Sequence, residues 1–130
     1  MIVVDSSVWI AHFRDAATPA VAALRGVSDP NEIIVGDLIL MECLQGAIDE
    51  RHAARIETAL AQFTPAQMLD PQLAVEAARN YRRLRGLGLT PRKTIDLIIG
   101  TYCIQHGHRL LHQDQAFAPM AAHLGLMCVL

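Results

Sequence analysis

Four acidic residues of the chain lie in apolar surroundings, where an ionised carboxylate is costly. Most of the thirteen Asp and Glu residues occupy polar or turn-like stretches, where solvation needs no explanation. The exceptions are Asp5 directly after a β-branched run, Glu42 and Asp96 inside apolar helical patterns, and Asp114 three residues after Leu110-Leu111. A buried carboxylate requires a partner, a raised pKa or a cation. These four residues are therefore the first candidates for a chemical site.

Each acid also has a structural explanation. Asp5 and Asp114 could cap helices, and Glu42 and Asp96 could pair with buried arginines. A single cation bound between the four acids would explain them together. Without it they would repel one another, because two unit charges at about 4 Å repel by about 4 kcal/mol at an effective dielectric constant of about 20. Mg²⁺ or Mn²⁺ would relieve this repulsion and could support phosphodiester hydrolysis by metal-activated water. The sequence near the acids offers no obvious internal cation.

The elements that must position these acids alternate between short apolar runs and helical patterns. We predict strands at residues 2–4, 33–35 and 110–111, a weak strand near 67–69 and a last strand at 127–129. Helices are predicted at 8–13, 38–47, 50–62, 71–86, 90–105 and 115–123. This alternation predicts an α/β fold with a central parallel sheet covered by helices on both faces. In such sheets the ligand crevice lies beyond the carboxyl ends of the strands, where Asp5 and Asp114 are expected.

Basic residues are concentrated in one segment. Six of the eleven Lys and Arg residues fall between positions 79 and 93, with no Asp or Glu between Glu76 and Asp96. Such a block is suited to phosphate contacts, and its alternative explanation is a solvated helix face. The residues that we expect to contact a nucleic-acid backbone are Arg82, Arg83, Arg85, Arg92 and Lys93.

Four segments together resemble a PIN domain and, more narrowly, the VapC toxins of bacterial type II toxin–antitoxin pairs. They are residues 1–10 (MIVVDSSVWI), Met41-Glu42 with Gly46, residues 92–107 (RKTIDLIIGTYCIQHG) and residues 110–117 (LLHQDQAF). The resemblance implies a three-layer α/β/α fold and a Mg²⁺-dependent endoribonuclease, with Mn²⁺ as an alternative metal. It also implies neutralisation by a VapB-type antitoxin.

The resemblance assigns roles to individual residues. By its motif, Asp5, Glu42, Asp96 and Asp114 are the catalytic, metal-site acids. Ser6 and Thr94 occupy positions where the family often places hydroxyl groups that orient these carboxylates. Two positions depart from the pattern: Ala116 stands where many relatives carry a further acid, and Gln113 stands where Asn is frequent. The first departure puts a second metal position in doubt.

Length and composition limit the class of protein. With 130 residues, 52% apolar residues and 18% charged residues, the chain is expected to form one domain over residues 1–130. No apolar run approaches the roughly 20 residues of a membrane span, and we expect no secretion signal. Three widely spaced cysteines indicate free thiols and a cytoplasmic protein. A mean hydropathy of +0.27 suggests surface buried in a homodimer or under an antitoxin.

Two other groups of polar residues have structural explanations. Asp37, which follows a predicted strand, is expected to cap the next helix. No Cys or acid completes a tetrahedral transition-metal site with His106, His108 and His112, so surface or helix-end positions are expected.

Three functions are compatible with these residues. The first is a toxin-type endoribonuclease that a partner inhibits by inserting an Arg or Lys where the metal belongs. The second is a PIN-like RNA-processing nuclease without an antitoxin. The third is a non-catalytic module in which the acids bind a structural ion or a basic partner.

Overall fold

A four-stranded parallel sheet forms the centre of the protein. The computed structural model describes residues 1–130. The strands β1 (Ile2–Val4), β2 (Ile33–Gly36), β3 (Thr64–Ala66) and β4 (Arg109–Leu111) lie in the order β3-β2-β1-β4, and every neighbouring pair is parallel. All residues of β1 and β2 are buried. Burial on both faces explains why these strands are continuous apolar runs rather than alternating patterns.

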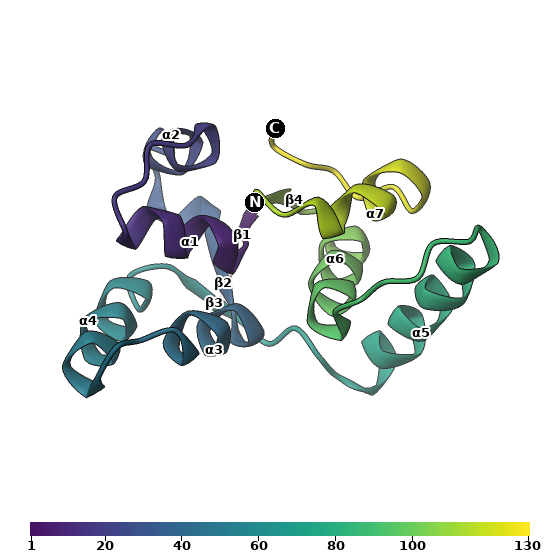
Figure 1. The fold of residues 1–130 in the computed structure, drawn as a ribbon, viewed down its shortest axis with the longest axis horizontal. Coiled ribbons are helices and arrows are strands. Elements are labelled where there is room, and N and C mark those ends of the chain that lie inside the picture. Colours follow the sequence, from purple (N-terminus) through teal and green to yellow (C-terminus); the bar gives the residue numbers. More distant parts are fainter.

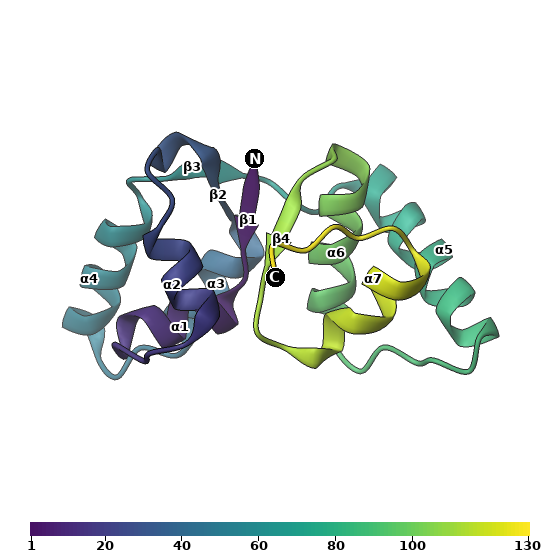
Figure 2. The same ribbon diagram turned by 90° about the horizontal axis from the view of Figure 1, so that it is seen from above.

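Helices cover both faces of this sheet (Figures 1 and 2). One layer holds α1 (Ser6–Phe13), α2 (Pro19–Arg25), α3 (Asp37–Gln45) and α4 (Glu50–Leu60). The other holds α5 (Pro71–Gly86), α6 (Thr94–His106) and α7 (Ala118–His123). Two 3₁₀ turns, η1 (Pro30–Glu32) and η2 (Gln115–Phe117), precede β2 and α7. The predicted three-layer α/β/α fold with a central parallel sheet is confirmed.

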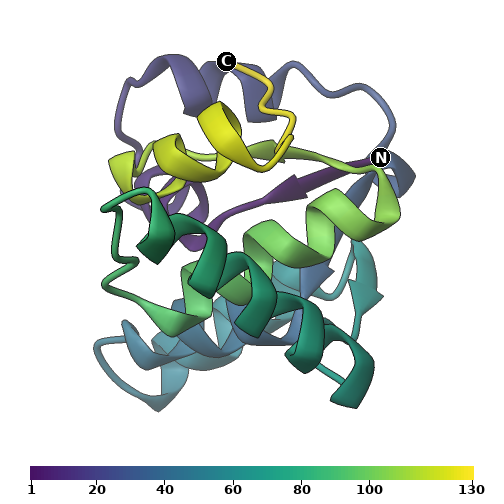
Figure 3. The same cartoon turned by 90° about the vertical axis from the view of Figure 1, so that its right-hand side faces the viewer.

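Helix α6 lies between the sheet and α5, and in Figure 3 α5 crosses in front of it. Its residues from Asp96 to Cys103 are all buried. Gly100 permits close packing of the next layer, because a Cβ at this position would lie 2.4 Å from Cε of Met120. Met120 of α7 is thereby held against α6, with 2% of its surface exposed. The middle of this helix is apolar on most sides because neighbouring elements cover it there.

Several boundaries differ from the sequence prediction. Strand β3 occupies residues 64–66 instead of 67–69, and Met68 is buried with its N–H bound to Oδ1 of Asp37. The predicted strand at 127–129 is reduced to a single bridge between Leu110 and Cys128. Helix α2 lies outside the predicted elements, since its alanine-rich sequence after Pro19 carries little periodicity.

The expected capping role of Asp37 is wrong. The N-cap of α3 is Gly36, and Asp37 is the first helical residue. Its carboxylate accepts the N–H groups of Leu38 and Met68, so it joins α3 to the segment after β3. The three cysteines are free thiols, as expected. No helix combines the length and apolarity that a membrane crossing requires.

Candidate active site at the carboxyl edge of the sheet

The four predicted acids come from different elements to one edge of the sheet. Asp5 follows β1, Asp114 follows β4, Glu42 lies on α3 and Asp96 lies in the first turn of α6. Asp5 and Asp96 are buried, with 2% and 6% of their surface exposed, whereas Glu42 and Asp114 are half-buried. Their charges influence one another, because Asp5 and Asp114 both raise the pKa of Glu42 and of Asp96. The strand order places this cluster beside β1 and β4, where the connecting helices pass to opposite faces of the sheet.

Asp5 uses only one of its carboxylate oxygens to cap α1. Oδ2 accepts the backbone N–H of Ser7 at 3.0 Å and the hydroxyl of Ser7 at 2.5 Å. Oδ1 is buried and has no hydrogen-bond partner. The capping explanation for Asp5 is therefore correct but accounts for half of the carboxylate. A buried and unpartnered carboxylate oxygen indicates a missing cationic or donor ligand.

Asp96 also has one carboxylate oxygen without a hydrogen-bond partner. Its Oδ2 atom is buried without a partner, and no arginine pairs with it. Burial, followed by the charge of Asp5, raises the pKa of Asp96 to about 6. Its position in the first turn of α6 favours the anionic form through the helix dipole. A nearby cation would lower this pKa and so complete the ionisation of the carboxylate at neutral pH.

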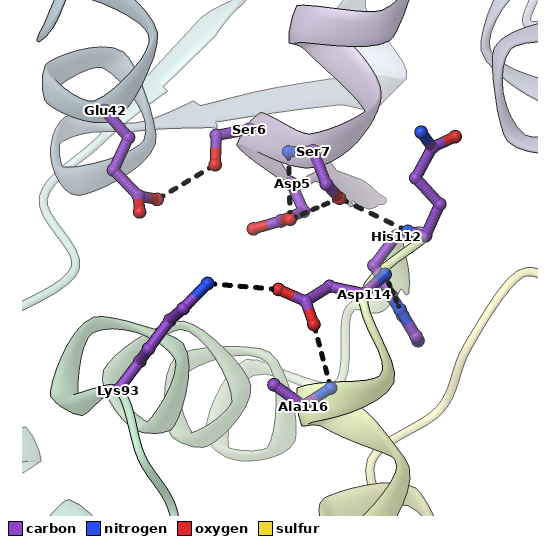
Figure 4. Close-up of polar contacts among 9 residues, drawn as sticks. Asp5, Ser6, Ser7, Glu42, Lys93, His112, Asp114 and Ala116 are labelled. Carbon is purple, nitrogen blue, oxygen red and sulfur yellow. Dashed lines mark hydrogen bonds and ion pairs between the residues drawn. The ribbon is translucent and has the colours of Figure 1, made fainter. Parts of the chain in front are cut away.

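Glu42 is oriented by a neighbouring hydroxyl. The Oγ atom of Ser6 donates a hydrogen bond of 3.1 Å to Oε1 of Glu42 (Figure 4). Burial raises the pKa of Glu42, and the hydrogen bond from Ser6 partly offsets this increase. Thr94 differs from Ser6: it begins α6, is exposed and makes no hydrogen bond to any of the acids.

Asp114 contacts both a backbone amide and a lysine. Oδ1 accepts the N–H of Ala116 at 2.9 Å, which caps η2, and Oδ2 lies 3.4 Å from Nζ of Lys93 (Figure 4). The hydrogen bond from Ala116 is the main cause of the lowered pKa of Asp114, and Lys93 contributes further. In turn Asp114 and Asp96 raise the pKa of Lys93. The expectation that the site lacks an internal cation is wrong, because the loop before α6 directs Lys93 back towards the acids.

A set of hydrogen bonds that the sequence does not predict connects the loops around the acids. The hydroxyl of Ser7 accepts the backbone N–H of Gln113 while it donates to Asp5, so one side chain joins the ends of β1 and β4. The side chain of Gln113 accepts a hydrogen bond from Thr18, the N-cap of α2. His112 accepts the N–H of Asp114 through Nδ1. The only sequence signal for Ser7 is its place directly after Asp5-Ser6.

The predicted RNA-contacting residues lie on the C-terminal half of α5 and on the loop before α6. All five are exposed. Arg85 lies over the ring of Tyr81, at 5.8 Å from its centroid, and Arg79, outside the predicted set, pairs with Glu76. Arg82, Arg83 and Arg92 form no ion pair with a carboxylate. These guanidinium groups are therefore free to bind an external anion.

The histidines form no metal site. No three His, Cys, Asp or Glu side chains converge on one point as a ligand set, and this applies to the four acids as well. His106 and His108 stack with each other and contact the ring of Tyr102. Nε2 of His112 lies 3.5 Å from Sγ of Cys128. His106 is exposed at the end of α6, as expected, whereas His108 and His112 are half-buried.

The protein combines an α/β/α fold with a cluster of acids at the carboxyl edge of a parallel sheet. Comparison with known proteins identifies the family that has this arrangement. The family model of the PIN domain matches residues 2–122, and the chain belongs to this family. Within it, the chain is 32% identical over 124 residues to a VapC ribonuclease of Mycobacterium bovis, across 93% of this chain and 92% of that protein. It is equally similar to Ribonuclease VapC11 of Mycobacterium tuberculosis.

Solved structures share the fold at low sequence identity. A chain of VapBC2 from Rickettsia felis, bound to a DNA fragment of its promoter, aligns with a TM-score of 0.79 at 14% identity and covers 98% of this chain and 97% of that one. VapBC-1 from nontypeable Haemophilus influenzae gives 0.75 at 15% identity, covering 98% and 96%. VapC20 of Mycobacterium tuberculosis, a toxin that cleaves the sarcin–ricin loop, gives 0.71 at 15% identity, covering 95% of each chain. At these identities the alignments establish the fold.

Proposed function

We propose that this protein is a VapC-type toxin, an endoribonuclease that hydrolyses RNA phosphodiester bonds with a divalent metal ion. The observation that carries the proposal is the pair of buried carboxylate oxygens without partners, Oδ1 of Asp5 and Oδ2 of Asp96. Glu42 and Asp114 lie beside them and add negative charge. Membership of the PIN domain family and relatives named VapC ribonucleases support the same activity.

The donor set fits a hard divalent cation. Every candidate ligand is a carboxylate oxygen, and such oxygens suit Mg²⁺ and Mn²⁺ better than softer ions. Three convergent side chains are not required, because Mg²⁺ usually binds one or two carboxylates and keeps several waters. Asp5 and Asp96 would hold the ion, with Asp114 and Glu42 at its periphery. We propose Mg²⁺ as the metal, with Mn²⁺ as an alternative. A bound ion would supply charge stabilisation to the substrate phosphate and lower the pKa of a water molecule.

The residues of the chain have separate tasks in this proposal. Asp5 and Asp96 provide negative charge at a fixed position, since Asp5 is held by the cap of α1 and Asp96 by the buried start of α6. Glu42 is oriented by Ser6, and its raised pKa makes it a stronger acceptor for a proton from an attacking water. Lys93 offers a positive charge for a phosphate oxygen that approaches the acids. The exposed arginines of α5 would contact the RNA backbone.

The binding partners that we propose for this protein follow from the same family assignment. Homologous folds occur in VapBC complexes, so we propose inhibition by a VapB-type antitoxin. Exposed apolar side chains such as Met41, Val75 and Leu87 offer surface that an antitoxin or a homodimer would bury.

A comparison of two isosteric variants tests the enzymatic proposal. Asp5→Asn removes a charge from the cluster, whereas Asp15→Asn removes one from an exposed ion pair with Arg25 at a left-handed backbone position that Asn tolerates. Cleavage of a mixed-sequence oligoribonucleotide pool is expected to require Mg²⁺ or Mn²⁺, to stop with EDTA, and to be lost only in Asp5→Asn. RNA cleavage at the wild-type rate by Asp5→Asn, or in EDTA, would contradict the proposal.

A further inference from the structure

A cavity opens directly beside the four acids. It has a volume of about 460 Å³ and lies between the end of α5, the loop before α6, η2 and α7. Asp96 and Asp114 form part of its wall, so the cavity and the candidate active site share two residues. Its volume falls within the range of roughly 300–1,000 Å³ typical of sites for small ligands. Whatever binds at the acids therefore has an adjoining space into which it can extend.

The walls of the cavity combine apolar and polar groups. Leu84, Leu97 and Met120 provide buried apolar surface, and Leu89 adds a half-buried side chain. The exposed lining residue Gln115 carries an amide that can both donate and accept hydrogen bonds. A flat group with apolar faces and a polar edge matches such walls, and an unpaired nucleobase has these properties.

The charges around the cavity favour a nucleotide over an apolar protein side chain. Arg92 and Lys93 line it, and Arg92 has no carboxylate partner. Arg82 and Arg83 are exposed on α5, the helix that contributes Leu84 to the cavity. A base entering the cavity would bring its own phosphate towards these cations and towards the acids, whereas an apolar side chain would use none of the charges.

Ala116 keeps one side of the cavity open. It is an exposed lining residue of η2, and its backbone N–H binds Asp114, so its side chain is small while its backbone is fixed. A larger side chain at this position would occupy the cavity without removing that hydrogen bond. The position thus allows the cavity to be filled while the acids are left unchanged.

We infer that this cavity is a base-binding subsite that receives one unpaired nucleobase of the RNA, adjacent to the phosphodiester bond that is cleaved. The inference rests on the proposed ribonuclease function and adds a position at which that function recognises RNA. Because the base enters the cavity, it must be unstacked and unpaired, so single-stranded RNA is the expected substrate form. The apolar walls stabilise the faces of the base, and the polar groups act on its edge.

A binding experiment tests the inference without relying on cleavage. The chain has five methionines, of which Met120 lines the cavity, whereas Met41 lies on α3 and Met68 lies in the segment between β3 and α5. In protein carrying ¹³C-labelled methionine methyl groups, AMP, GMP, CMP and UMP are titrated to about 10 mM, above the Kd of millimolar ligands. At least one nucleotide is expected to shift the Met120 methyl signal and leave Met41 and Met68 unchanged. Ribose 5-phosphate, which has no base, should not shift it. No response of Met120 to any nucleotide would overturn the inference.

A second experiment uses abasic substrates. Along an oligoribonucleotide that the wild-type protein cleaves, one base at a time is removed. Removal at a single position next to the cleaved bond is expected to lower kcat/KM at least tenfold. Ala116→Phe should lower cleavage of the intact RNA similarly and be indifferent to that abasic site. The matched control is Ala122→Phe, on an exposed position of α7 outside the cavity.

The outcomes separate the inference from the proposed function. If the wild-type protein cleaves no RNA with Mg²⁺ or Mn²⁺, the proposed function fails. If it cleaves RNA but every abasic substrate reacts at the intact rate, only the base-binding subsite fails. The subsite also fails if Ala116→Phe cleaves RNA normally and instead escapes inhibition by the antitoxin, because the cavity would then be a protein-binding surface.

Discussion

Nζ of Lys93 lies 3.4 Å from Oδ2 of Asp114, and this ion pair places the only lysine of the chain against the acids of the candidate active site. The pair is largely exposed on the lysine side, where 63% of the side chain is accessible. Exposed pairs contribute little free energy, typically below about 1 kcal/mol. Lys93 therefore neutralises part of the negative charge of the acidic cluster. Because the ion pair is weak, an incoming cation can displace the lysine.

Replacement of Lys93 by Gln should strengthen metal binding and weaken RNA binding. Without the neighbouring positive charge, we expect the Kd for Mg²⁺ to fall about two- to fivefold, which corresponds to a pair that contributes below about 1 kcal/mol. Isothermal titration calorimetry at low ionic strength measures this change. Arg109→Gln, at an exposed position beginning β4, is the control. Weaker Mg²⁺ binding by Lys93→Gln would show that the lysine organises the acids instead of competing for them.

Asp96→Asn should stabilise the metal-free protein in a pH-dependent manner. Because the folded-state pKa of Asp96 is about 6 and the ordinary value is 3.8, the unfolded chain ionises first as pH rises. Ionisation in the unfolded state destabilises the fold progressively between about pH 4 and pH 6, and the penalty is constant above that range. We expect the advantage of the variant in free energy of unfolding to grow from near zero at about pH 4 to at most about 3 kcal/mol at about pH 8.

Urea unfolding in EDTA measures this difference, and Asp15→Asn is the control. With saturating Mg²⁺ the order should reverse, because the wild-type protein gains binding free energy that the variant loses. An advantage that does not change with pH would contradict the assigned ionisation of Asp96.

Ser6→Ala should raise the pKa of Glu42. The hydroxyl of Ser6 donates to Oε1 of Glu42 and thereby favours the ionised carboxylate. Loss of this bond should move the acidic limb of the kcat/KM profile to higher pH. An NMR titration of the Glu42 carboxyl carbon provides a readout that does not depend on catalysis. Ser28→Ala, in the exposed loop before η1, should leave both measurements unchanged.

Removal of positive charges from α5 and the following loop should flatten the salt dependence of RNA binding. The slope of log K against log salt concentration decreases by roughly 0.7 for each single-strand phosphate that the protein no longer neutralises. We expect this change for Gln substitutions at Arg82, Arg83 and Arg92, with little change in sequence preference. Arg51→Gln and Arg55→Gln, on the exposed face of α4, are the controls. An unchanged slope would make the basic block a solvated helix face.

Antitoxin binding should weaken as Mg²⁺ increases. In the proposed function the acids bind either a metal ion or a cationic side chain of the antitoxin, and two ligands that exclude each other reduce each other's affinity. Affinity for the cognate antitoxin, measured across a Mg²⁺ titration at constant ionic strength, is expected to fall. An affinity that is indifferent to Mg²⁺ would mean that the antitoxin covers the site without entering it.

The candidate site can be located from the sequence because a carboxylate that becomes buried is flanked by apolar residues in the chain. Asp5 directly follows an apolar strand, and Asp96 interrupts an apolar helix, so the neighbours of each carboxylate in the chain reveal the cost of desolvating it. The parallel sheet can also be predicted from the sequence, since strands buried on both faces are continuous apolar runs. Short or edge elements are less predictable: β3 contains a proline and is only partly buried, and the segment after it is held by a hydrogen bond from Met68 to Asp37.

The sequence by itself determined the α/β alternation, the identity of the four acids and the position of the basic block, because periodicity and local polarity encode them. Only the tertiary structure decided how these groups meet. It placed Lys93 against Asp114, joined the ends of β1 and β4 through Ser7, and left one oxygen each of Asp5 and Asp96 unpartnered. These features depend on the path of loops between distant segments, and hydrogen bonds across such distances leave no periodic signal in a single sequence.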